Sequence, residues 1–311
     1  MVSIIIPVYN RADLVVRTLQ SVLAQTLRPL EVVLVDNNST DDTLSVLQDF
    51  KTKHDAPDFR VTVATEPQPG AARARNLGAK LSHGEWLLFF DSDDTLEPDA
   101  VECFFKVAED SNADIVTGRA DRLNLNGTKG KTPFYKDNLL VNNMFHSSIC
   151  PSNSLLSRLL CERVGWWNAE LRAWDDWEFA MRMLLENPAV AFCDDTIKIH
   201  IFLQRQSITG TEFSSKAGTW EAAIDAVERA LQQAVDLPNR ERLLKYIDFR
   251  RVALSGAYIG EGRRDLARPL FEKAYNNVRH DRTARWLYPL LRSYIAAGGR
   301  GASHIVKRLV K

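Results

Sequence analysis

The chain has 311 residues, of which 45% are hydrophobic and 26% are charged, values typical of globular domains. Forty Lys and Arg residues balance forty Asp and Glu residues, so the formal net charge is zero. This balance gives no general electrostatic case for nucleic-acid binding, which usually needs a basic excess. The apolar content excludes a disordered chain. The length predicts one large domain or two.

The first strand-like run and the cysteines bear on where the protein works. Residues 2–7 are apolar but lack a basic flank and a cleavage-site pattern, so we expect a strand there and no signal peptide. No apolar stretch approaches the ~20 residues that a membrane-spanning helix needs. The cysteines are far apart, without a Cys-x-x-Cys pair, and we expect reduced thiols and a cytoplasmic protein. These cysteines are Cys103, Cys150, Cys161 and Cys193.

Strands and helices alternate over the first 120 residues. Hydrophobic runs predict strands over residues 2–8, 31–35, 60–64, 85–90 and 113–117. Helical apolar spacing predicts helices over residues 13–24, 41–50, 70–81 and 98–110. This alternation is typical of an α/β fold with a mostly parallel sheet, whose ligands lie at the carboxyl ends of the strands.

The rest of the chain divides into two regions of different character. Residues 119–143 are polar and rich in turn formers, and we expect a loop over the site. A helix over residues 170–186 and strands over 189–193 and 196–203 follow. The remaining pattern predicts helices over residues 220–235, 241–259, 263–275 and 283–297. We therefore expect a catalytic domain over residues 1–213 and a helical region over 214–311.

Charge is distributed unevenly between these two regions. Residues 1–213 hold 21 Lys and Arg against 30 Asp and Glu, a net of −9, whereas residues 214–311 hold 19 against 10, a net of +9. Residues 295–311 form a short basic amphipathic segment, which suits an anionic membrane surface. A packed or frayed terminal helix, or a homodimer contact, explains this segment equally well.

Three polar turns follow the predicted strands. Asp91, Asp93 and Asp94 end one strand, and such clustered carboxylates suit Mg²⁺ or Mn²⁺, although they also suit a helix N-cap. Asp36 ends another strand and could accept a hydrogen bond from a nucleobase, or simply belong to a loop. Arg75 lies near the start of a Gly- and Ala-rich helix, where it could bind a diphosphate.

Together these motifs resemble glycosyltransferase family 2, whose members are inverting enzymes with the GT-A fold. The resemblance rests on Val-Ser-Ile-Ile-Ile-Pro-Val-Tyr-Asn, Val-Asp-Asn-Asn-Ser-Thr, Gly-Ala-Ala-Arg-Ala-Arg-Asn and Asp-Ser-Asp-Asp, in that order, and covers roughly residues 1–210. It implies a nucleotide-diphospho-sugar donor, foremost a UDP-sugar. It places Pro7, Tyr9 and Asp36 around the base, Arg75 near the phosphates, Asp91 on the ribose, and Asp91 and Asp93 on Mn²⁺ or Mg²⁺.

The same resemblance points to a catalytic base in residues 164–178. Asp176 falls on the position of the base, and Asp175 stands where the family usually has Glu. A carboxylate beside another carboxylate has a raised pKa, which favours proton acceptance. The alternative is that both residues only start the next helix. Trp174 could stack on a sugar or pack in the core, and His200 could replace the family's usual His as a metal or phosphate ligand or be structural.

The expected reaction is metal-dependent transfer of a sugar, with inversion, to a hydroxyl group. The resemblance suggests a glycan or lipid-linked acceptor and cell-envelope polysaccharide synthesis, at the inner face of the membrane. A sugar nucleotidyltransferase is the alternative enzyme, although Pro7 and the residues after it replace the Gly-rich loop that such enzymes carry. A catalytically inactive nucleotide- or glycan-binding module is the alternative outside catalysis.

Overall fold

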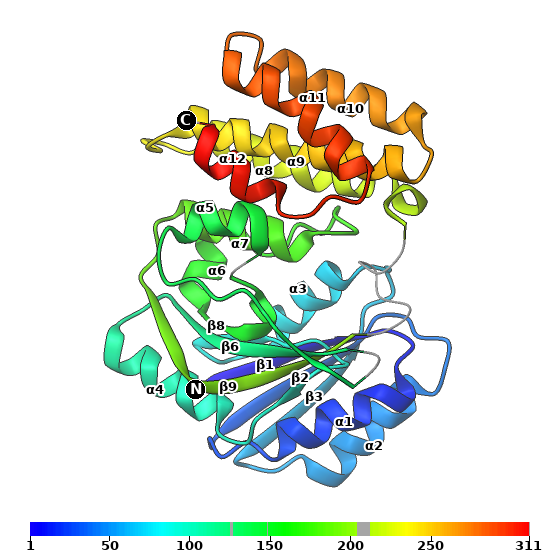
Figure 1. Cartoon of the computed structure of the whole chain (residues 1–311). Helices are drawn as coiled ribbons and strands as arrows, with labels where there is room; N and C mark the ends of the chain where they lie inside the picture. Colours follow the sequence, from blue (N-terminus) through cyan, green and yellow to red (C-terminus); the bar gives the residue numbers. More distant parts are fainter. Residues whose placement is uncertain (125–126, 148, 204–211, 311) are drawn as a thin grey trace. The chain divides into compact units, whose positions relative to one another are not determined.

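The computed structural model describes residues 1–124, 127–147, 149–203 and 212–310 (Figure 1). The chain folds into two compact units. The sheet unit comprises Met1–Leu139 and Ser148–Arg205, and the helical unit comprises Leu140–Ser147 and Gln206–Lys311. In the described part of the chain, no helix combines the length and the apolar character needed to cross a membrane.

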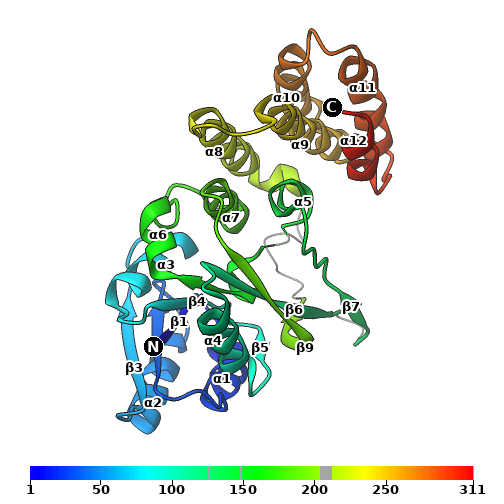
Figure 2. The same ribbon diagram turned by 90° about the vertical axis from the view of Figure 1, so that its left-hand side faces the viewer.

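The sheet unit is built on one mixed sheet with the strand order β3-β2-β1-β4-β8-β6-β9-β5 (Figures 1 and 2). One block of parallel strands is β1 (Val2–Val8), β2 (Leu30–Asp36), β3 (Phe59–Thr65) and β4 (Trp86–Phe89), and β6 and β9 form a second parallel pair. The other strands are β5 (Thr95–Leu96), β6 (Ile115–Leu123), β7 (Lys129–Lys131), β8 (Ser154–Ser157) and β9 (Val190–Phe202). The α/β class with a sheet flanked by helices is confirmed, whereas the expected mostly parallel sheet is a mixed one, with antiparallel pairings at β4/β8, β6/β8, β6/β7 and β5/β9.

Helices cover both faces of the parallel strands because β1 and β2 carry apolar side chains on both faces. On one face lie α1 (Ala12–Leu23), α2 (Thr43–His54) and α4 (Ala100–Ser111), and on the other α3 (Ala71–Leu81) (Figure 1). Gly78 lets α3 approach the sheet, since a Cβ atom there would lie 2.4 Å from Ile5 Cγ2 and 3.3 Å from Val35 Cγ2.

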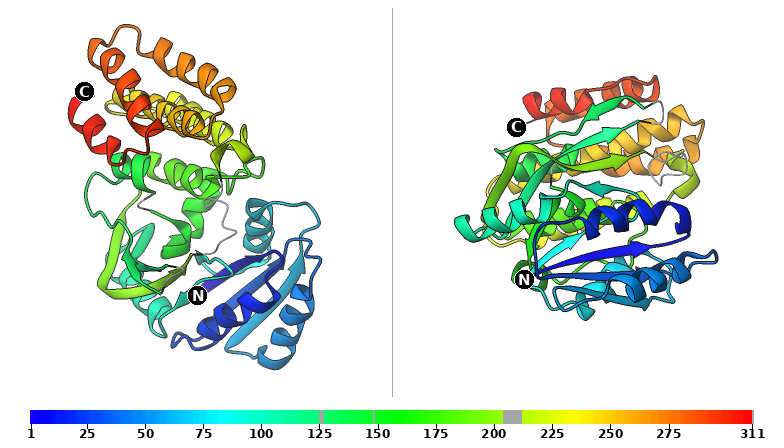
Figure 3. Two further views of the ribbon diagram at one scale, coloured as in Figure 1. Left: turned by 45° about the vertical axis from the view of Figure 1, so that its right-hand side comes forward. Right: turned by 90° about the horizontal axis from the view of Figure 1, so that it is seen from below.

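The region after residue 118 is more ordered than its polar sequence predicts. A loop was expected over residues 119–143, and this expectation is wrong for three segments. Strand β6 continues to Leu123, β7 pairs with β6, and α5 (Leu139–His146) begins at Leu139. The two strands expected over residues 189–203 are one long strand, β9, drawn in yellow-green in Figure 3. Register shifts between Gly118 and Ala120 let β9 remain paired with β6 along this length.

Two short helices and a longer one complete the sheet unit. They are η1 (Pro151–Asn153), α6 (Arg158–Val164) and α7 (Asp175–Leu185). Ser157 caps α6 by accepting a hydrogen bond from the backbone N–H of Leu160. The expected start of α7 at residue 170 is five residues early, because Trp174 adopts a left-handed conformation with φ 53° and the helix begins after it.

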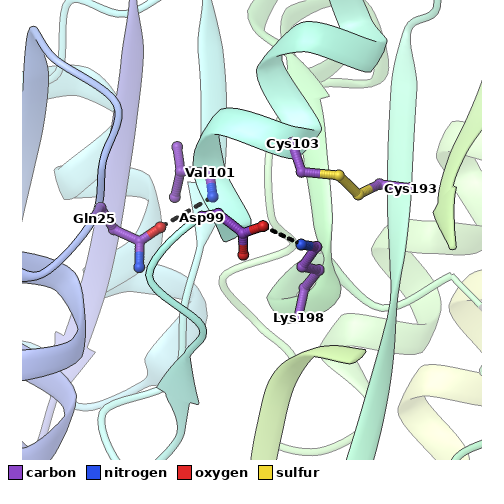
Figure 4. Close-up of a disulfide and its surroundings, with 6 residues drawn as sticks. All are labelled: Gln25, Asp99, Val101, Cys103, Cys193 and Lys198. Atoms are coloured by element: carbon purple, nitrogen blue, oxygen red, sulfur yellow. Dashed lines mark hydrogen bonds and ion pairs between the residues drawn. A yellow bond between two sulfur atoms is a disulfide. The ribbon is translucent and has the colours of Figure 1, made fainter. Parts of the chain in front are cut away.

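A disulfide links Cys103 of α4 to Cys193 of β9, 90 residues apart (Figure 4). The expectation of four reduced thiols is therefore wrong for this pair, whereas Cys150 and Cys161 are free. Lys198 of β9 also pairs with Asp99, which precedes α4, at 2.5 Å. The disulfide and the ion pair thus fix α4 to β9 at two points.

The helical unit contains α5 and a set of helices after residue 212. They are η3 (Phe213–Lys216), α8 (Thr219–Gln233), α9 (Arg240–Gly260), α10 (Arg264–Asn277), α11 (Arg282–Ala296) and α12 (Ala302–Leu309). The central helix α9 packs against α8, α10 and α11, and its Arg251 is fully buried. Arg251 forms ion pairs with Asp225, Glu228 and Asp248 at 2.7–2.9 Å.

Candidate active site

The polar turns after β1, β2 and β4 meet at one edge of the sheet, because these strands are parallel. The backbone N–H of Asn10 donates to Ser39 Oγ at 3.0 Å, and Asn10 Oδ1 accepts from the N–H of Thr40 at 2.8 Å. The N–H of Arg11 donates to Thr43 Oγ1 at 2.9 Å. These bonds join the turns after β1 and β2 into one surface.

Asp36 stands at the end of β2 with only 2% of its surface exposed. Its Oδ2 accepts a hydrogen bond from the N–H of Ser39 at 3.2 Å, while its Oδ1 is buried and has no hydrogen-bond partner among the described residues. A buried acceptor without a partner costs free energy until a donor reaches it. Tyr9, by contrast, is 56% exposed, and Pro7 is half-buried in β1.

The acidic turn after β4 is held by α1 and β9. Arg17 donates to the carbonyl oxygen of Asp93 at 2.6 Å, and Thr18 donates to that of Asp94 at 2.7 Å. The backbone N–H of Phe202 donates to Asp94 Oδ1 at 3.0 Å. Burial, and then the charge of Asp91, raise the pKa of Asp94 to about 8 and also raise the pKa of Asp93. The hydrogen bonds thus hold Asp91, Asp93 and Asp94 close together in spite of the repulsion between their carboxylates.

Arg75 of α3 joins this turn to the start of α7. Its Nη2 lies 2.9 Å from Asp91 Oδ1 and its Nη1 lies 2.9 Å from Asp175 Oδ2. The guanidinium also lies over the ring of Trp167, 4.3 Å from the ring centroid. Burial lowers the pKa of Arg75, but the charges of Asp175 and Asp91 outweigh it and raise that pKa. A permanent positive charge thus lies between two carboxylates from distant segments.

Asn76 fixes this arrangement from the neighbouring position. Its Nδ2 donates to the carbonyl oxygen of Trp167 at 2.9 Å, and its Oδ1 accepts from the N–H of Trp167 at 3.0 Å. Asn37 similarly holds the start of α3, because its Oδ1 accepts from the N–H of Gly70 at 2.7 Å. Neither residue was predicted from the sequence as part of the site. Asn76 was noticeable in the sequence as an amide side chain within an Ala-rich helix, but its partner, the backbone of Trp167, could not be inferred.

Asp175 and Asp176 lie in the first turn of α7, as the alternative interpretation expected, and Asp175 also contacts Arg75. Burial, and then the charge of Asp175, raise the pKa of Asp176 to about 6, while a hydrogen bond from the backbone of Trp177 and the charge of Arg75 oppose the shift. The charge of Asp176 also contributes to the raised pKa of Arg75. Asp91, Arg75, Asp175 and Asp176 therefore form one electrostatic cluster.

His200 and Trp174 have different surroundings. His200 Nδ1 lies 2.7 Å from Asp121 Oδ1 and its Nε2 lies 2.7 Å from Glu97 Oε1, so both ring nitrogens already contact carboxylates. Burial lowers the pKa of His200, but these two hydrogen bonds raise it overall. Trp174 is half-buried beside the fully buried Trp177, with ring centroids 6.0 Å apart.

The acidic turn after β4 is the candidate binding site for a divalent cation. Within the described ranges, no group of three or more His, Cys, Asp or Glu residues could hold a metal ion. Asp91 and Asp93 nevertheless fit Mg²⁺ or Mn²⁺, which one or two carboxylates bind together with water and phosphate oxygens. The pKa of Asp93 is raised by burial and by Asp91, and its ion pair with Arg11 is long, at 3.9 Å. A cation would relieve this repulsion.

The family comparison agrees with the class of site that this edge defines. In an α/β sheet, ligands bind at the carboxyl ends of the strands, which is where the acidic turn and Arg75 lie. The family described as "Glycosyl transferase family 2" matches residues 3–165, which is more than half of the chain. The chain therefore belongs to glycosyltransferase family 2, and it is a glycosyltransferase.

Named relatives come from several bacteria. Glycosyltransferase GlyG of Streptococcus pneumoniae is 28% identical over 68% of this chain and 74% of its own length. The poly(ribitol-phosphate) β-glucosyltransferase of Bacillus spizizenii is 29% identical over 62% of this chain but only 31% of its own length. The PGL/p-HBAD biosynthesis glycosyltransferase of Mycobacterium bovis is 35% identical over 61% of this chain and 72% of its own length.

Solved structures share the fold. S. aureus TarS 1-349 in complex with UDP-GlcNAc has a TM-score of 0.74 at 18% identity, covering 99% of this chain and 91% of that one. The mannosyltransferase PcManGT from Pyrobaculum calidifontis, in complex with GDP-Man and Mn²⁺, has a TM-score of 0.61 at 19% identity, covering 98% and 83%. These similarities confirm the GT-A fold.

Proposed function

We propose that the protein transfers a sugar from a nucleoside-diphosphate donor to an acceptor hydroxyl group, with inversion at the anomeric carbon. The observation that carries the proposal is the convergence of Asp91 and Asp175 on Arg75, with Asp176 beside them. In this proposal Arg75 stabilises the leaving diphosphate and Asp176 accepts the proton of the acceptor.

The donor's nucleoside fits the edge formed by β1 and β2. Asp36 Oδ1 is buried without a partner and can accept a hydrogen bond from a base N–H. Tyr9, which follows β1 and its residue Pro7, has an exposed ring that could stack on the base. UDP-GlcNAc in the TarS complex supports a UDP-sugar as the donor of this protein. GDP-Man in the PcManGT complex makes a GDP-sugar the second donor to test.

The diphosphate and a divalent cation fit the acidic turn. Asp91 and Asp93 would hold Mn²⁺ or Mg²⁺, and Asp91 would also bind the ribose; the Mn²⁺ in the PcManGT complex supports the assignment of a metal. Such a cation neutralises charge that develops on the leaving diphosphate. Arg75 supplies a second positive charge at the same place and needs no protonation step.

Asp176 accepts the proton of the acceptor hydroxyl. Its raised pKa, about 6, leaves it ionised near neutral pH yet more basic than an ordinary aspartate. As the acceptor oxygen bonds to the anomeric carbon, the bond from that carbon to the diphosphate oxygen breaks, and the proton passes to Asp176. A single displacement of this kind inverts the anomeric carbon. Asp175 positions Arg75, and Trp174 would stack on a sugar of the acceptor.

The domain roles and the setting extend this proposal. We assign catalysis to residues 1–213 and acceptor or partner contacts to residues 214–311. The names of two relatives, a poly(ribitol-phosphate) β-glucosyltransferase and a chondroitin synthase, support a glycan acceptor. We extend this to a glycan or lipid-linked acceptor in cell-envelope synthesis. The reaction would take place at the cytoplasmic face of the membrane, where nucleotide-sugars are made. The Cys103–Cys193 disulfide makes this location worth testing, since disulfides are uncommon in reducing compartments.

The proposal is tested by a hydrolysis and transfer screen of UDP- and GDP-sugars, with added Mn²⁺ or with a chelator. We expect nucleoside diphosphate release from one donor, loss of that release with the chelator, and an inverted anomeric configuration in the product by NMR. Calorimetry with Asp93→Ala should show loss of metal-dependent donor binding. Turnover in the presence of the chelator contradicts the proposed metal dependence. Retention of the anomeric configuration contradicts the proposed single displacement.

A further inference from the structure

Helix α11 is apolar on two faces, but the helical unit buries only one of them. Toward α9 it packs Ala284, Leu287, Tyr288 and Leu291. On the other side, Trp286, Leu290 and Tyr294 follow one another at four-residue spacing, so they form one row along the helix. Their exposed fractions are 68%, 51% and 46%. Large apolar side chains in a continuous exposed row mark an interaction surface.

The row lies within the most basic part of the chain. After Asp281 the sequence contains no acidic residue, while it contains seven Lys and Arg residues in its last 30 positions. Arg282 continues the exposed row by one turn, four residues before Trp286, and is itself exposed. The partner of this surface must therefore tolerate apolar side chains and carry negative charge.

Helix α12 presents the same chemistry. Ile305 and Leu309 are exposed and lie four residues apart, and Arg308 is exposed next to them. On its opposite side, Ala302 and Val306 are buried. Two helices of one unit thus combine an anchored apolar side with an exposed side that is both apolar and basic.

We propose that the exposed rows of α11 and α12 bind an anionic lipid surface. Trp and Tyr favour the interface between headgroups and acyl chains, and neighbouring Arg and Lys side chains favour anionic headgroups. A hydrated anionic polymer would leave the aliphatic Leu290, Ile305 and Leu309 without an apolar partner. A second copy joined about a two-fold axis would place this acid-free region against itself. Lipid satisfies both the apolar and the charged side chains.

Vesicle flotation of the full chain without donor tests the proposal separately from sugar transfer. The probes are phosphatidylcholine vesicles and equimolar phosphatidylcholine–phosphatidylglycerol vesicles. We expect flotation with the anionic vesicles, little with the neutral ones, and loss at about 0.5 M salt, where charges are screened within a few ångströms. Equal flotation with both compositions, or none with either, overturns the proposal.

The apolar row is tested by W286S/L290S, which leaves Tyr294 and its bond to the backbone of Arg300 in place. We expect vesicle partitioning to fall at least about tenfold, because two half-exposed large side chains no longer enter the interface. The matched control is L159S/V235S, which removes two side chains that are 73% and 85% exposed elsewhere. Equal partitioning of the variant and the control contradicts the assignment, provided that circular dichroism shows both folded.

The basic contribution is tested by R282Q/R308Q against R60Q/K80Q, which removes two exposed charges from the sheet unit. Each charge near an anionic surface changes partitioning about fivefold, so the first variant should lose about 25-fold and the control little. Two results would favour another partner and overturn the proposal. One is loss of self-association by W286S/L290S in sedimentation, and the other is binding of a soluble polyanion without vesicle binding.

Discussion

Asp176→Asn removes the proposed proton acceptor and keeps the shape of the side chain. A positioned general base contributes about 10²–10⁴ to a rate, so kcat should fall by that factor, which corresponds to about 3–5 kcal/mol of activation free energy. Donor affinity should stay near the wild-type value, because removing a negative charge next to Asp175 and Asp91 reduces repulsion at the donor side of the cluster.

The pH profile makes this prediction quantitative. With a pKa of about 6, Asp176 is about 90% ionised at pH 7 and about 10% ionised at pH 5. The wild-type rate should therefore fall about ninefold between these values, whereas an aspartate with an ordinary pKa would lose less than about a tenth of its activity. In the Asn variant this ionisation is gone, and its small residual rate should lack the fall attributed to Asp176.

The assay is single-turnover transfer from the donor identified in the screen, measured from pH 5 to pH 8 at saturating donor. The matched control is Asp110→Asn, which removes an exposed carboxylate from the last turn of α4. Both variants should bind donor normally in calorimetry. A wild-type rate in Asp176→Asn, or a loss expressed only in the KM for donor, would refute the assignment of the base.

Three further predictions concern the groups that support the site and the fold. Arg75→Lys keeps the charge but cannot bridge two carboxylates, so kcat/KM should fall about 10- to 100-fold, the loss of one hydrogen bond to a charged group; an unchanged kcat/KM would contradict the bridging role. Reduction of the Cys103–Cys193 disulfide should lower the free energy of unfolding, measured in urea, by about 2–5 kcal/mol. The stability of Cys103→Ser should not change on adding reductant, whereas that of Cys161→Ser, which removes a free thiol, should fall as in the wild type. Arg251→Met leaves three acidic side chains without their buried partner, and thermal and urea unfolding should show a loss of about 3–5 kcal/mol; a loss below about 1 kcal/mol would mean that the ion pairs contribute little.

Local patterns predicted the parallel half of the sheet well. The strand over residues 2–8 has the same bounds in the structure, and β2 extends the expected run by one residue at each end. These strands are buried on both faces, so continuous apolar runs define them. The strand β8 and the helix α6 were missed, because four and seven residues are too few for a periodic signal.

The site was predictable in its residue types but not in its contacts. Asp91, Asp36 and Arg75 could be singled out because each stands where an apolar strand ends or a helix begins. Nothing in the sequence says that Arg75 contacts Asp175, 100 residues later, since that contact depends on how α3 and α7 pack. The pairing of Cys103 with Cys193 was hidden for the same reason.

Gly78 lies one helical turn after Arg75 and touches no group of the site. A methyl group there would lie 2.4 Å from Ile5 Cγ2, so α3 or the side chain of Ile5 would have to move. Any outward movement of α3 lengthens both contacts of Arg75, because the carboxylates that it bridges belong to other elements. The positions of the groups around Arg75 are therefore set partly by packing in the hydrophobic interior, where a substitution of Gly78 would disturb the core and both contacts of Arg75 together.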